Sequence, residues 1–342
     1  MEQNRKYTPI DFKSDQEVKW CPGCGDHAIL SAVQKALPEV AEELNYEHER
    51  FTFVSGIGCS SRFPYYMHTF GFHGIHGRAA AIATGVKVSN PELSVWQVTG
   101  DGDALAIGGN HFIHAIRRNI DINIMLFNNE IYGLTKGQYS PTSKLGKITK
   151  TSPYGTIEHP FSPGELVLGA RGTFYARSLD VDVKLTMECL KESAKHDGTS
   201  VLEIMQNCVI FNDKTHDIFT NKEFREDRTI VLKHGEPMIF GKNKDKGLVL
   251  QGLGLKVVTI GEGGWTLNNI LVHNAYQKSP GVHMMLVNMK GPNFPVALGV
   301  IRDVRDFTYD DCMQEQIATV KESSNIKCCD DLFRSGDTWE VE

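Results

Sequence analysis

Long hydrophobic runs are absent from this sequence. No apolar stretch approaches the ~18 residues that a helix needs to cross a bilayer. The first 20 residues also lack the apolar core of a secretory signal peptide. We therefore expect no association with a membrane and a cytoplasmic location.

Cysteine and excess positive charge are scarce as well. Eight cysteines in 342 residues are too few for a secreted disulfide framework, so thiols that cluster are better interpreted as metal ligands. The net charge of −6 gives no sign of a nucleic-acid partner. Residues 301–342 hold 11 acidic and 5 basic side chains, an excess equal to the net charge of the whole chain. This segment is expected to be a solvated acidic tail.

A strand, a helix and a second strand are predicted around the most informative motif. The apolar run at residues 94–99 leads directly into Gly100-Asp101-Gly102, and the run at residues 122–127 leads into Asn128-Asn129. In a parallel sheet both strands end at the same edge, where open α/β sheets bind ligands. Asp101 and Asn129 should therefore lie side by side.

The residue types at this edge suit a magnesium–diphosphate site. A carboxylate, an amide oxygen and a backbone carbonyl just beyond Asn129 are the hard oxygen ligands that Mg²⁺ accepts. The glycine turn exposes backbone N–H groups that suit an anion. An ordinary βαβ unit is the alternative, which the spacing and a second glycine-rich loop at residues 132–138 make less attractive.

Three cysteine elements precede or follow predicted secondary structure. Cys21 and Cys24 form a CxxC motif, which fits a redox pair, a zinc site or an iron–sulfur anchor. Cys59 follows a predicted strand at residues 51–55, and Cys208 follows another at residues 199–206. A four-cysteine site is plausible, although Cys59 and Cys208 could instead be small buried hydrophobic residues. The other cysteines are expected in the core (Cys189) or as bystanders in the tail (Cys312, Cys328, Cys329).

The second half of the chain gives weaker signals. A long glycine- and proline-rich loop is expected at residues 141–163 and a polar arm at residues 213–245. Further elements are predicted as a strand at 256–260, a helix at 266–278 and a strand at 282–287. The glycine pairs after residue 250 lack the context of a dinucleotide-binding motif.

The string GDGDALAIGGNHFIHAIRRN, followed by NNEIYGLTKGQYSPTS, closely resembles the β subunit of 2-oxoacid:ferredoxin oxidoreductases. The similarity extends from about Trp20 to about Arg302. It implies a thiamine-diphosphate-binding fold, a parallel α/β sheet flanked by helices. The implied cofactors are thiamine diphosphate, Mg²⁺ and a [4Fe–4S] cluster. The implied reaction is oxidative decarboxylation of a 2-oxoacid with coenzyme A and ferredoxin, together with an α subunit.

The resemblance also assigns residues to the cofactors. Asp101, Asn129 and the Ile131 carbonyl would hold Mg²⁺, and the cluster ligands would be Cys21, Cys24, Cys59 and Cys208. Thiamine diphosphate would contact residues on three loops: Ile57, Gly58, Ser60, Gly100, Asp101, Gly102, Asp103, Asn129, Ile131, Gly133, Leu134 and Thr135. On this basis, residues 1–210 are expected to form the cofactor core and residues 211–300 an arm plus remaining elements of the same domain. Residues 301–342 would be the tail.

Three further residues are expected to face the substrate: Arg62, His76 and Leu134. A guanidinium at position 62 can bind a second substrate carboxylate, which favours 2-oxoglutarate over pyruvate. His76 could instead cap the helix that follows it. Lys136 stands where pyruvate-type members commonly have glycine. The alternatives are a pyruvate-type enzyme, a redox-silent decarboxylase or carboligase subunit, and a non-catalytic iron–sulfur or zinc protein.

Overall fold

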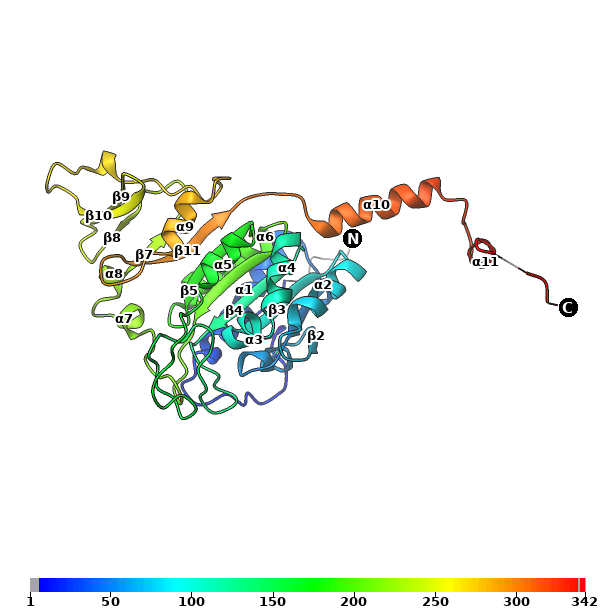
Figure 1. The fold of residues 1–342 in the computed structure, drawn as a ribbon, viewed down its shortest axis with the longest axis horizontal. Coiled ribbons are helices and arrows are strands. Elements are labelled where there is room, and N and C mark those ends of the chain that lie inside the picture. The colour runs from blue at the N-terminus through cyan, green and yellow to red at the C-terminus, as the bar shows by residue number, and fades with distance from the viewer. Residues whose placement is uncertain (1–5, 338, 342) are drawn as a thin grey trace.

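An eight-stranded sheet forms the centre of the molecule in this computed structural model, which describes residues 6–337 and 339–341 (Figure 1). The first six strands in spatial order run parallel, and the last two run in the opposite direction. The order is β2 (Phe70–His73), β1 (Phe51–Ser55), β3 (Ser94–Gly100), β4 (Asn123–Asn128), β6 (Ser200–Met205), β5 (Phe174–Leu179), β11 (Val296–Asp303) and β7 (Thr229–Leu232). The predicted mostly parallel α/β sheet is confirmed.

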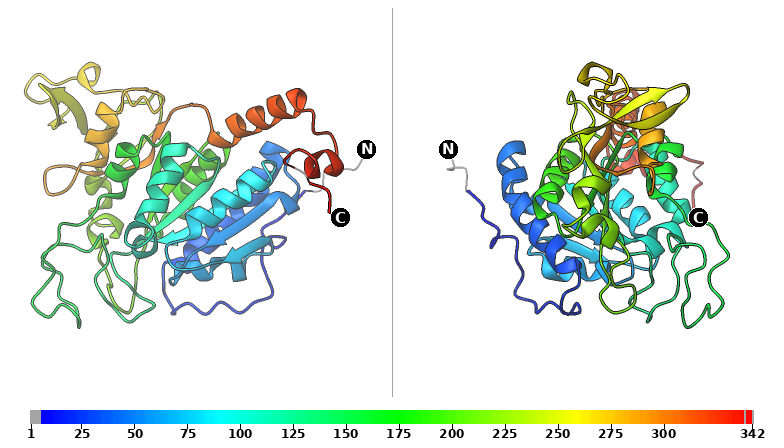
Figure 2. Two further views of the ribbon diagram at one scale, coloured as in Figure 1. Left: turned by 45° about the vertical axis from the view of Figure 1, so that its right-hand side comes forward. Right: turned by 90° about the vertical axis from the view of Figure 1, so that its left-hand side faces the viewer.

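Helices cover both faces of this sheet (Figure 2). One face packs on α1 (Asp26–Leu44) and α6 (Val183–Lys195). The other packs on α2 (Ala79–Ser89), α4 (Gly109–Arg118), α5 (Pro163–Gly169) and α9 (Gly281–Val287). Every residue of β1, β4 and β5 is buried, as expected for strands that are covered on both sides. The two resulting cores fix the loops at the carboxyl ends of the strands.

Short helical segments connect several of these elements. They are η1 (His48–Arg50), η2 (Ser60–Tyr66), α3 (Asp101–Leu105), α7 (Asp217–Thr220) and α8 (Arg225–Arg228). Residues 141–162 form the predicted long loop, which hangs below the sheet in Figure 1. None of the helices in the described part of the chain is long and apolar enough to cross a membrane.

Two element predictions in the second half are wrong. The helix expected at residues 266–278 is only the short turn η3 (Leu267–Asn269), and the strand expected at residues 282–287 is helix α9. Helix α9 buries His283, Leu286 and Val287, a spacing of three and four residues that is typical of a helix. A short apolar run in the sequence does not distinguish a helix from a strand.

Residues 239–259 form a separate antiparallel sheet of three strands. These are β8 (Ile239–Phe240), β9 (Lys246–Gln251) and β10 (Gly254–Thr259), and the hairpin between the last two turns at Gly252 with a φ of 63°. The domain boundary expected at residue 300 falls inside β11, whose last three residues belong to the main sheet. The tail then forms α10 (Tyr309–Ser323), which projects from the body, and α11 (Cys329–Phe333) (Figures 1 and 2).

Candidate active site

The loops at the carboxyl ends of β1, β3 and β4 enclose a cavity of about 180 Å³. All of the residues expected at thiamine diphosphate line it, together with His76: Ile57, Gly58, Ser60, Gly100, Asp101, Gly102, Asp103, Asn129, Ile131, Gly133, Leu134 and Thr135. Arg62 does not line this cavity. Phe127 and Tyr132, which the sequence did not single out, also form part of its wall.

Asp101 lies at the start of α3 and is 2% exposed. Its Oδ2 accepts hydrogen bonds from the hydroxyls of Ser140, at 2.5 Å, and Thr142, at 2.6 Å. No basic side chain of the described residues pairs with it. Burial raises the pKa of Asp101 to about 6, although the two hydroxyl hydrogen bonds act in the opposite direction. A buried carboxylate without a cationic partner is a fitting ligand for a divalent cation.

Asn129 and Ile131 add two further oxygens beside this carboxylate. Asn129 Oδ1 accepts the N–H of Ile131 at 3.1 Å, which holds the first turn after β4. Among the described residues, no donor bonds to the Ile131 carbonyl, although Ile131 is 3% exposed. A buried carbonyl without a donor is costly unless a ligand satisfies it. The donor set therefore fits Mg²⁺.

The Asp103 carboxylate is fully engaged by groups of the chain itself. Its carboxylate, 3% exposed, accepts hydrogen bonds from the Ile57 N–H at 3.0 Å, the Gly77 N–H at 2.7 Å, the Thr99 hydroxyl at 2.7 Å and His76 Nδ1 at 2.7 Å. The carboxylate joins the loops after β1 and β2 to the start of α3. A contact between Asp103 and a diphosphate would therefore come from its backbone.

The glycine turn is closed on one side by Tyr132. A Cβ atom on Gly102 would lie 2.2 Å from the Tyr132 ring, so no larger residue fits there. The Tyr132 hydroxyl donates to the Gly102 carbonyl at 3.0 Å. The aromatic ring thus fixes the backbone of the turn that the motif places at the diphosphate.

The four cysteines assigned to the cluster line a second cavity, of about 190 Å³. Cys21 and Cys24 approach it from the segment before α1, Cys59 from the loop after β1, and Cys208 from the loop after β6. Gln206 Nε2 donates to Cys24 Sγ at 3.2 Å, and Trp20 Nε1 donates to the Cys59 carbonyl at 2.7 Å. Neither of these supporting residues was predicted, although Trp20 directly precedes the CxxC motif.

Burial raises the pKa of the Cys59 thiol to about 12, and the charge of Asp26 and the thiols of Cys208 and Cys21 act in the same direction. Burial also raises the pKa of the Cys24 thiol, and the charge of Asp26 and the thiols of Cys208 and Cys59 act in the same direction. Thiols in such a site are neutral unless a cationic metal group holds them as thiolates. No group of three or more metal-binding side chains in the described residues is arranged around a single ion. Four thiols that line one cavity are a ligand set that fits either an iron–sulfur cluster or a zinc ion.

The two cavities share a wall formed by Cys59, Asn129, Gly133 and Leu134. A Cβ atom on Gly133 would lie 3.4 Å from Cys208 Sγ and 3.6 Å from Cys59 Sγ. The site for hard oxygen ligands and the site for thiols are thus separated by one loop residue without a side chain.

The three residues expected near the substrate lie at different places on this wall. Leu134, 45% exposed, lines both cavities. Arg62 lines the thiol cavity, and no acceptor among the described residues bonds to its guanidinium. The His76 ring lines the first cavity and is oriented by Asp103.

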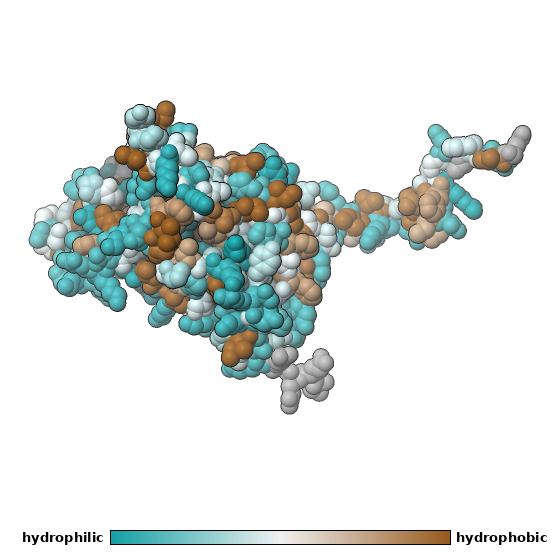
Figure 3. Space-filling model, turned by 90° about the horizontal axis from the view of Figure 1, so that it is seen from below, coloured by the Kyte–Doolittle hydropathy of each residue, from teal (hydrophilic) through white to brown (hydrophobic). Residues whose placement is uncertain are grey.

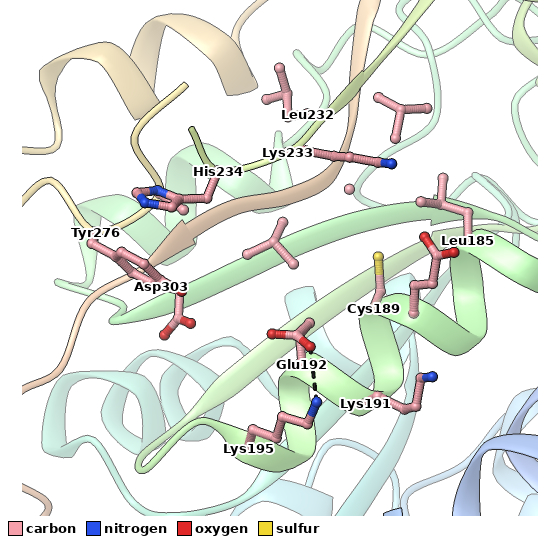
Figure 4. A pocket seen from close by; sticks show the side chains of 15 residues that line it. Leu185, Cys189, Lys191, Glu192, Lys195, Leu232, Lys233, His234, Tyr276 and Asp303 are labelled. Carbon is pink, nitrogen blue, oxygen red and sulfur yellow. Dashed lines mark hydrogen bonds and ion pairs between the residues drawn. The ribbon is translucent and has the colours of Figure 1, made fainter. Parts of the chain in front are cut away.

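A third cavity, of about 320 Å³, lies between α6 and the strands β7 and β11 (Figure 4). None of the predicted site residues lines it. Its charges are largely paired within the chain: Lys195 donates to Glu192 at 3.3 Å, and His196 bonds to Asp303 at 2.7 Å. Cys189, expected in the core, forms part of its wall and is 1% exposed.

Comparison with known proteins identifies the domain that contains these loops. Residues 56–204 match the family model of the thiamine pyrophosphate enzyme, C-terminal TPP binding domain, so this stretch is a thiamine-diphosphate-binding domain. The range includes the loops after β1, β3 and β4 that line the cavity. Of the four clustered cysteines, only Cys59 falls within it.

Relatives extend the similarity to the rest of the chain. The 2-oxoglutarate oxidoreductase subunit KorB of Mycobacterium tuberculosis is 48% identical over 335 residues, which cover 97% of this chain and 88% of the relative. The beta subunit of 2-oxoacid:ferredoxin oxidoreductase 1 of Aeropyrum pernix is 41% identical over 238 residues, 69% of this chain and 72% of the relative.

A solved structure agrees with the sequence relatives. It is a 2-oxoglutarate:ferredoxin oxidoreductase from Magnetococcus marinus with 2-oxoglutarate, coenzyme A and succinyl-CoA bound. The superposition has a TM-score of 0.74 at 29% identity and covers 96% of this chain and 95% of that chain. Identity of this extent over nearly the full length shows that the chain belongs to the family of 2-oxoacid:ferredoxin oxidoreductase beta subunits, as the motifs from Gly100 to Ser143 predicted.

Proposed function

We propose that this chain is the β subunit of a 2-oxoacid:ferredoxin oxidoreductase that decarboxylates 2-oxoglutarate oxidatively and forms succinyl-CoA. Mg²⁺ would be held by Asp101, Asn129 and the Ile131 carbonyl, and a [4Fe–4S] cluster by Cys21, Cys24, Cys59 and Cys208. Ferredoxin would accept the electrons and coenzyme A the acyl group. The names of the relatives support this assignment.

One observation carries the redox part of the proposal: the cofactor cavity and the four-thiol cavity share the wall at Gly133. A decarboxylase that transfers no electrons needs the oxygen ligands but not the thiols. A structural iron–sulfur or zinc protein needs the thiols but not Asp101 and Asn129. Only a redox enzyme of the proposed kind needs both sites in contact.

Thiamine diphosphate supplies the electron sink for decarboxylation when it is bound. The chain's own residues position and surround it. Tyr132 and Asp103 hold the turn around Gly102, and Gly133 leaves space between the two sites. The His76 ring is fixed through Nδ1 by Asp103 and stands in the cavity wall.

The α subunit is the expected partner at this edge. The loop between β4 and α5 exposes hydrophobic side chains, which an isolated chain would leave in water: Leu145, Ile148, Tyr154, Ile157 and Phe161. Figure 3 shows brown hydrophobic patches among teal residues on the underside of the body, from which this loop extends. Such surfaces mark protein interfaces. A partner there would close the cofactor cavity from outside.

Arg62 supports the choice of 2-oxoglutarate within the 2-oxoacids. Its guanidinium lines the cavity beside Leu134 and has no carboxylate partner among the described residues. A substrate with a second carboxylate would supply that partner through a charge-assisted pair. Pyruvate has none.

The cofactor assignment is tested by anaerobic purification of the chain together with its α partner. We expect bound thiamine diphosphate, iron with acid-labile sulfide, and reduction of a dye by 2-oxoglutarate plus coenzyme A. Cys208→Ser should lose the iron, and the matched control Cys189→Ser should keep it because that thiol lies elsewhere. Thiamine diphosphate without iron in the wild-type complex would favour the redox-silent alternative.

The substrate assignment is tested with Arg62→Ala in the same complex. The variant should lose at least about tenfold in kcat/KM for 2-oxoglutarate while its turnover of pyruvate is spared, because only the former loses an ion pair. Arg228→Ala, which removes an arginine that bonds only to a backbone carbonyl, is the control. Unchanged selectivity in Arg62→Ala would overturn the role of Arg62.

A further inference from the structure

Behind the Asp101 carboxylate lies a chain of buried polar side chains that no cofactor contact explains. Thr142 Oγ1 is 2.6 Å from Asp101 Oδ2 and 3.0 Å from Asn128 Oδ1. Asn128 Nδ2 donates to Glu203 Oε1 at 2.7 Å. Asn128, Thr142 and Glu203 are 4%, 5% and 2% exposed.

Glu203 is itself fixed by two neighbours on β5. Arg177 Nε donates to Glu203 Oε2 at 2.6 Å, and the Tyr175 hydroxyl donates to the same oxygen. Arg177 and Glu203 are directly paired in the register of β5 and β6. Burial would raise the pKa of Glu203, but the charge of Arg177 and the hydrogen bonds from Tyr175 and Asn128 outweigh it and keep the pKa below its usual value. The carboxylate is therefore ionised and only accepts hydrogen bonds.

This charge state determines how the amide of Asn128 is turned. Because ionised Glu203 offers only acceptors, Asn128 must present its NH₂ group to Glu203 and its carbonyl oxygen to Thr142. The Thr142 hydroxyl has one hydrogen, which it can donate either to Asp101 or to Asn128, but not to both at once. Asn128 is thus the second acceptor for the hydroxyl that contacts the expected metal ligand.

A buried ion pair is poor evidence for stability, since well-packed hydrophobic residues often serve equally well. The placement of this pair behind a metal carboxylate suggests another use. We propose that Glu203, Asn128 and Thr142 form a positioning chain for the magnesium carboxylate. It holds the Asp101 carboxylate in place through the Thr142 hydroxyl, for which the Asn128 amide oxygen is a second acceptor. The inference rests on the proposed function.

Metal affinity in the αβ complex tests the chain without measuring turnover. Mn²⁺ replaces Mg²⁺, and free Mn²⁺ is measured by electron paramagnetic resonance in the presence of thiamine diphosphate. Thr142→Val removes the hydroxyl at nearly constant volume and should weaken Mn²⁺ binding by about 10-fold to 100-fold, as outer contacts of metal ligands do. Thr142→Ser keeps the hydroxyl and should bind within about threefold of wild type, which a purely steric role would not predict.

Two further variants serve different purposes: one controls for the loss of a buried hydroxyl, and the other tests whether Asn128 belongs to the positioning chain. Thr186→Val removes an equally buried hydroxyl on α6, which bonds to Ser178 and the Leu179 carbonyl, and should leave Mn²⁺ affinity unchanged. Asn128→Leu should weaken Mn²⁺ binding as Thr142→Val does. If Asn128→Leu does not fold, as judged by thermal unfolding, the comparison of Thr142→Val with Thr142→Ser alone tests the positioning chain.

The outcomes separate this inference from the function on which it rests. If wild type binds Mn²⁺ and Asp101→Asn does not, but Thr142→Val binds within about twofold of wild type, the positioning chain is wrong and the metal site stands. If wild type binds no Mn²⁺, or Asp101→Asn binds it equally well, the metal site is wrong and the chain is wrong with it.

Discussion

Gly133 is the residue at which the two parts of the site meet. Its missing side chain leaves Cys59 and Cys208 free to approach the loop from one side while the oxygen ligands line the other. Its backbone does not have a positive φ, so flexibility is not the reason for a glycine here. A methyl group here would lie at van der Waals distance from both thiols, on the wall that the two cavities share.

Gly133→Ala should lower the iron content of the anaerobically purified complex to about half or less, because the added methyl group would touch both thiols and compete with the cluster for the space beside them. Iron and acid-labile sulfide per chain are the measurements. Gly109→Ala is the matched control, since a Cβ there meets nothing within 4 Å. Full iron content in Gly133→Ala would contradict the cluster assignment at this wall.

Local motifs predicted some of these residues and missed others. Asp101 and Asn129 directly follow predicted strands, so their placement at one edge follows from chain order alone. Ser140 and Thr142 lie in a long loop whose path no pattern determines, and they were missed although they bond to Asp101. The partners of the Asp103 carboxylate were also missed, because three of the four come from the loops after β1 and β2.

At the scale of elements, two helix ends show how similar residues perform different tasks. Asn45 and Asn119 end α1 and α4, and both have a left-handed backbone, with φ of 52° and 54°. Asn45 is exposed. Asn119 is 7% exposed; its side chain donates to the Phe307 carbonyl and accepts from Thr173 and from the Thr199 N–H. Asn119 thus holds together β5, β6 and the segment before α10.

Glycine substitutions at the two caps should separate these tasks. Asn45→Gly should change the free energy of unfolding by only a few tenths of a kcal/mol, because glycine adopts the left-handed backbone freely. Asn119→Gly keeps the backbone but loses three buried hydrogen bonds and should cost about 2–4 kcal/mol. Urea denaturation of both variants measures the difference, and equal costs would contradict this account.

Helix α9 contains a histidine that makes stability depend on pH. His283, 1% exposed, bonds through Nε2 to the Asn274 carbonyl at 2.9 Å, and Arg302 Nη1 donates to its Nδ1 at 3.0 Å. Burial lowers the pKa of His283 to about 4, and the charges of Arg302 and His273 add to this effect. The native state therefore keeps this ring neutral where an unfolded chain protonates it.

The free energy of unfolding should fall as pH decreases from about 6.5, the pKa of an unperturbed histidine, towards about 4, by roughly 1–3 kcal/mol from this group. Above that window its contribution is fully present. His283→Gln should flatten this part of the profile, measured by urea denaturation at successive pH values. His159→Gln, at an exposed position, is the control and should not flatten it.

Elements with local signals were predicted well, and those that depend on distant partners were not. The strand at residues 51–55 was predicted with its bounds, because its hydrophobic run is bounded by polar and glycine residues. Helix α9 was taken for a strand because only tertiary packing shows which of its sides is buried. Strand β7 was not predicted because it lies in a polar segment. Its partner β11 is more than fifty residues later in the sequence.

At the scale of the whole molecule, the main sheet includes strands that come later in the sequence than any residue of the candidate site. The residues proposed to hold the cofactors all lie before residue 210, the boundary expected for the core. The main sheet nevertheless continues through β11, which pairs with the edge of β5, and through β7 beyond it. A core ending at residue 210 would leave the hydrophobic edge of β5 unpaired.

Residues 1–210 expressed alone should therefore aggregate although they contain every predicted site residue, because exposed strand edges pair with other chains. A chain that ends at residue 324 keeps the whole sheet and should remain as soluble as the full chain. Soluble yield and size-exclusion chromatography are the measurements. A monodisperse 1–210 fragment would show that β11 is dispensable.

The position of β11 also has a consequence for biosynthesis. Strand β5 ends at Leu179, but the strand that covers its edge begins at Val296, so the intervening segment must leave the ribosome first. Until then the nascent chain carries a bare edge beside an otherwise finished cofactor-binding unit. Because bare edges pair with other polypeptides, the nascent chain is prone to aggregation during this interval. Translation of β11 ends that exposure.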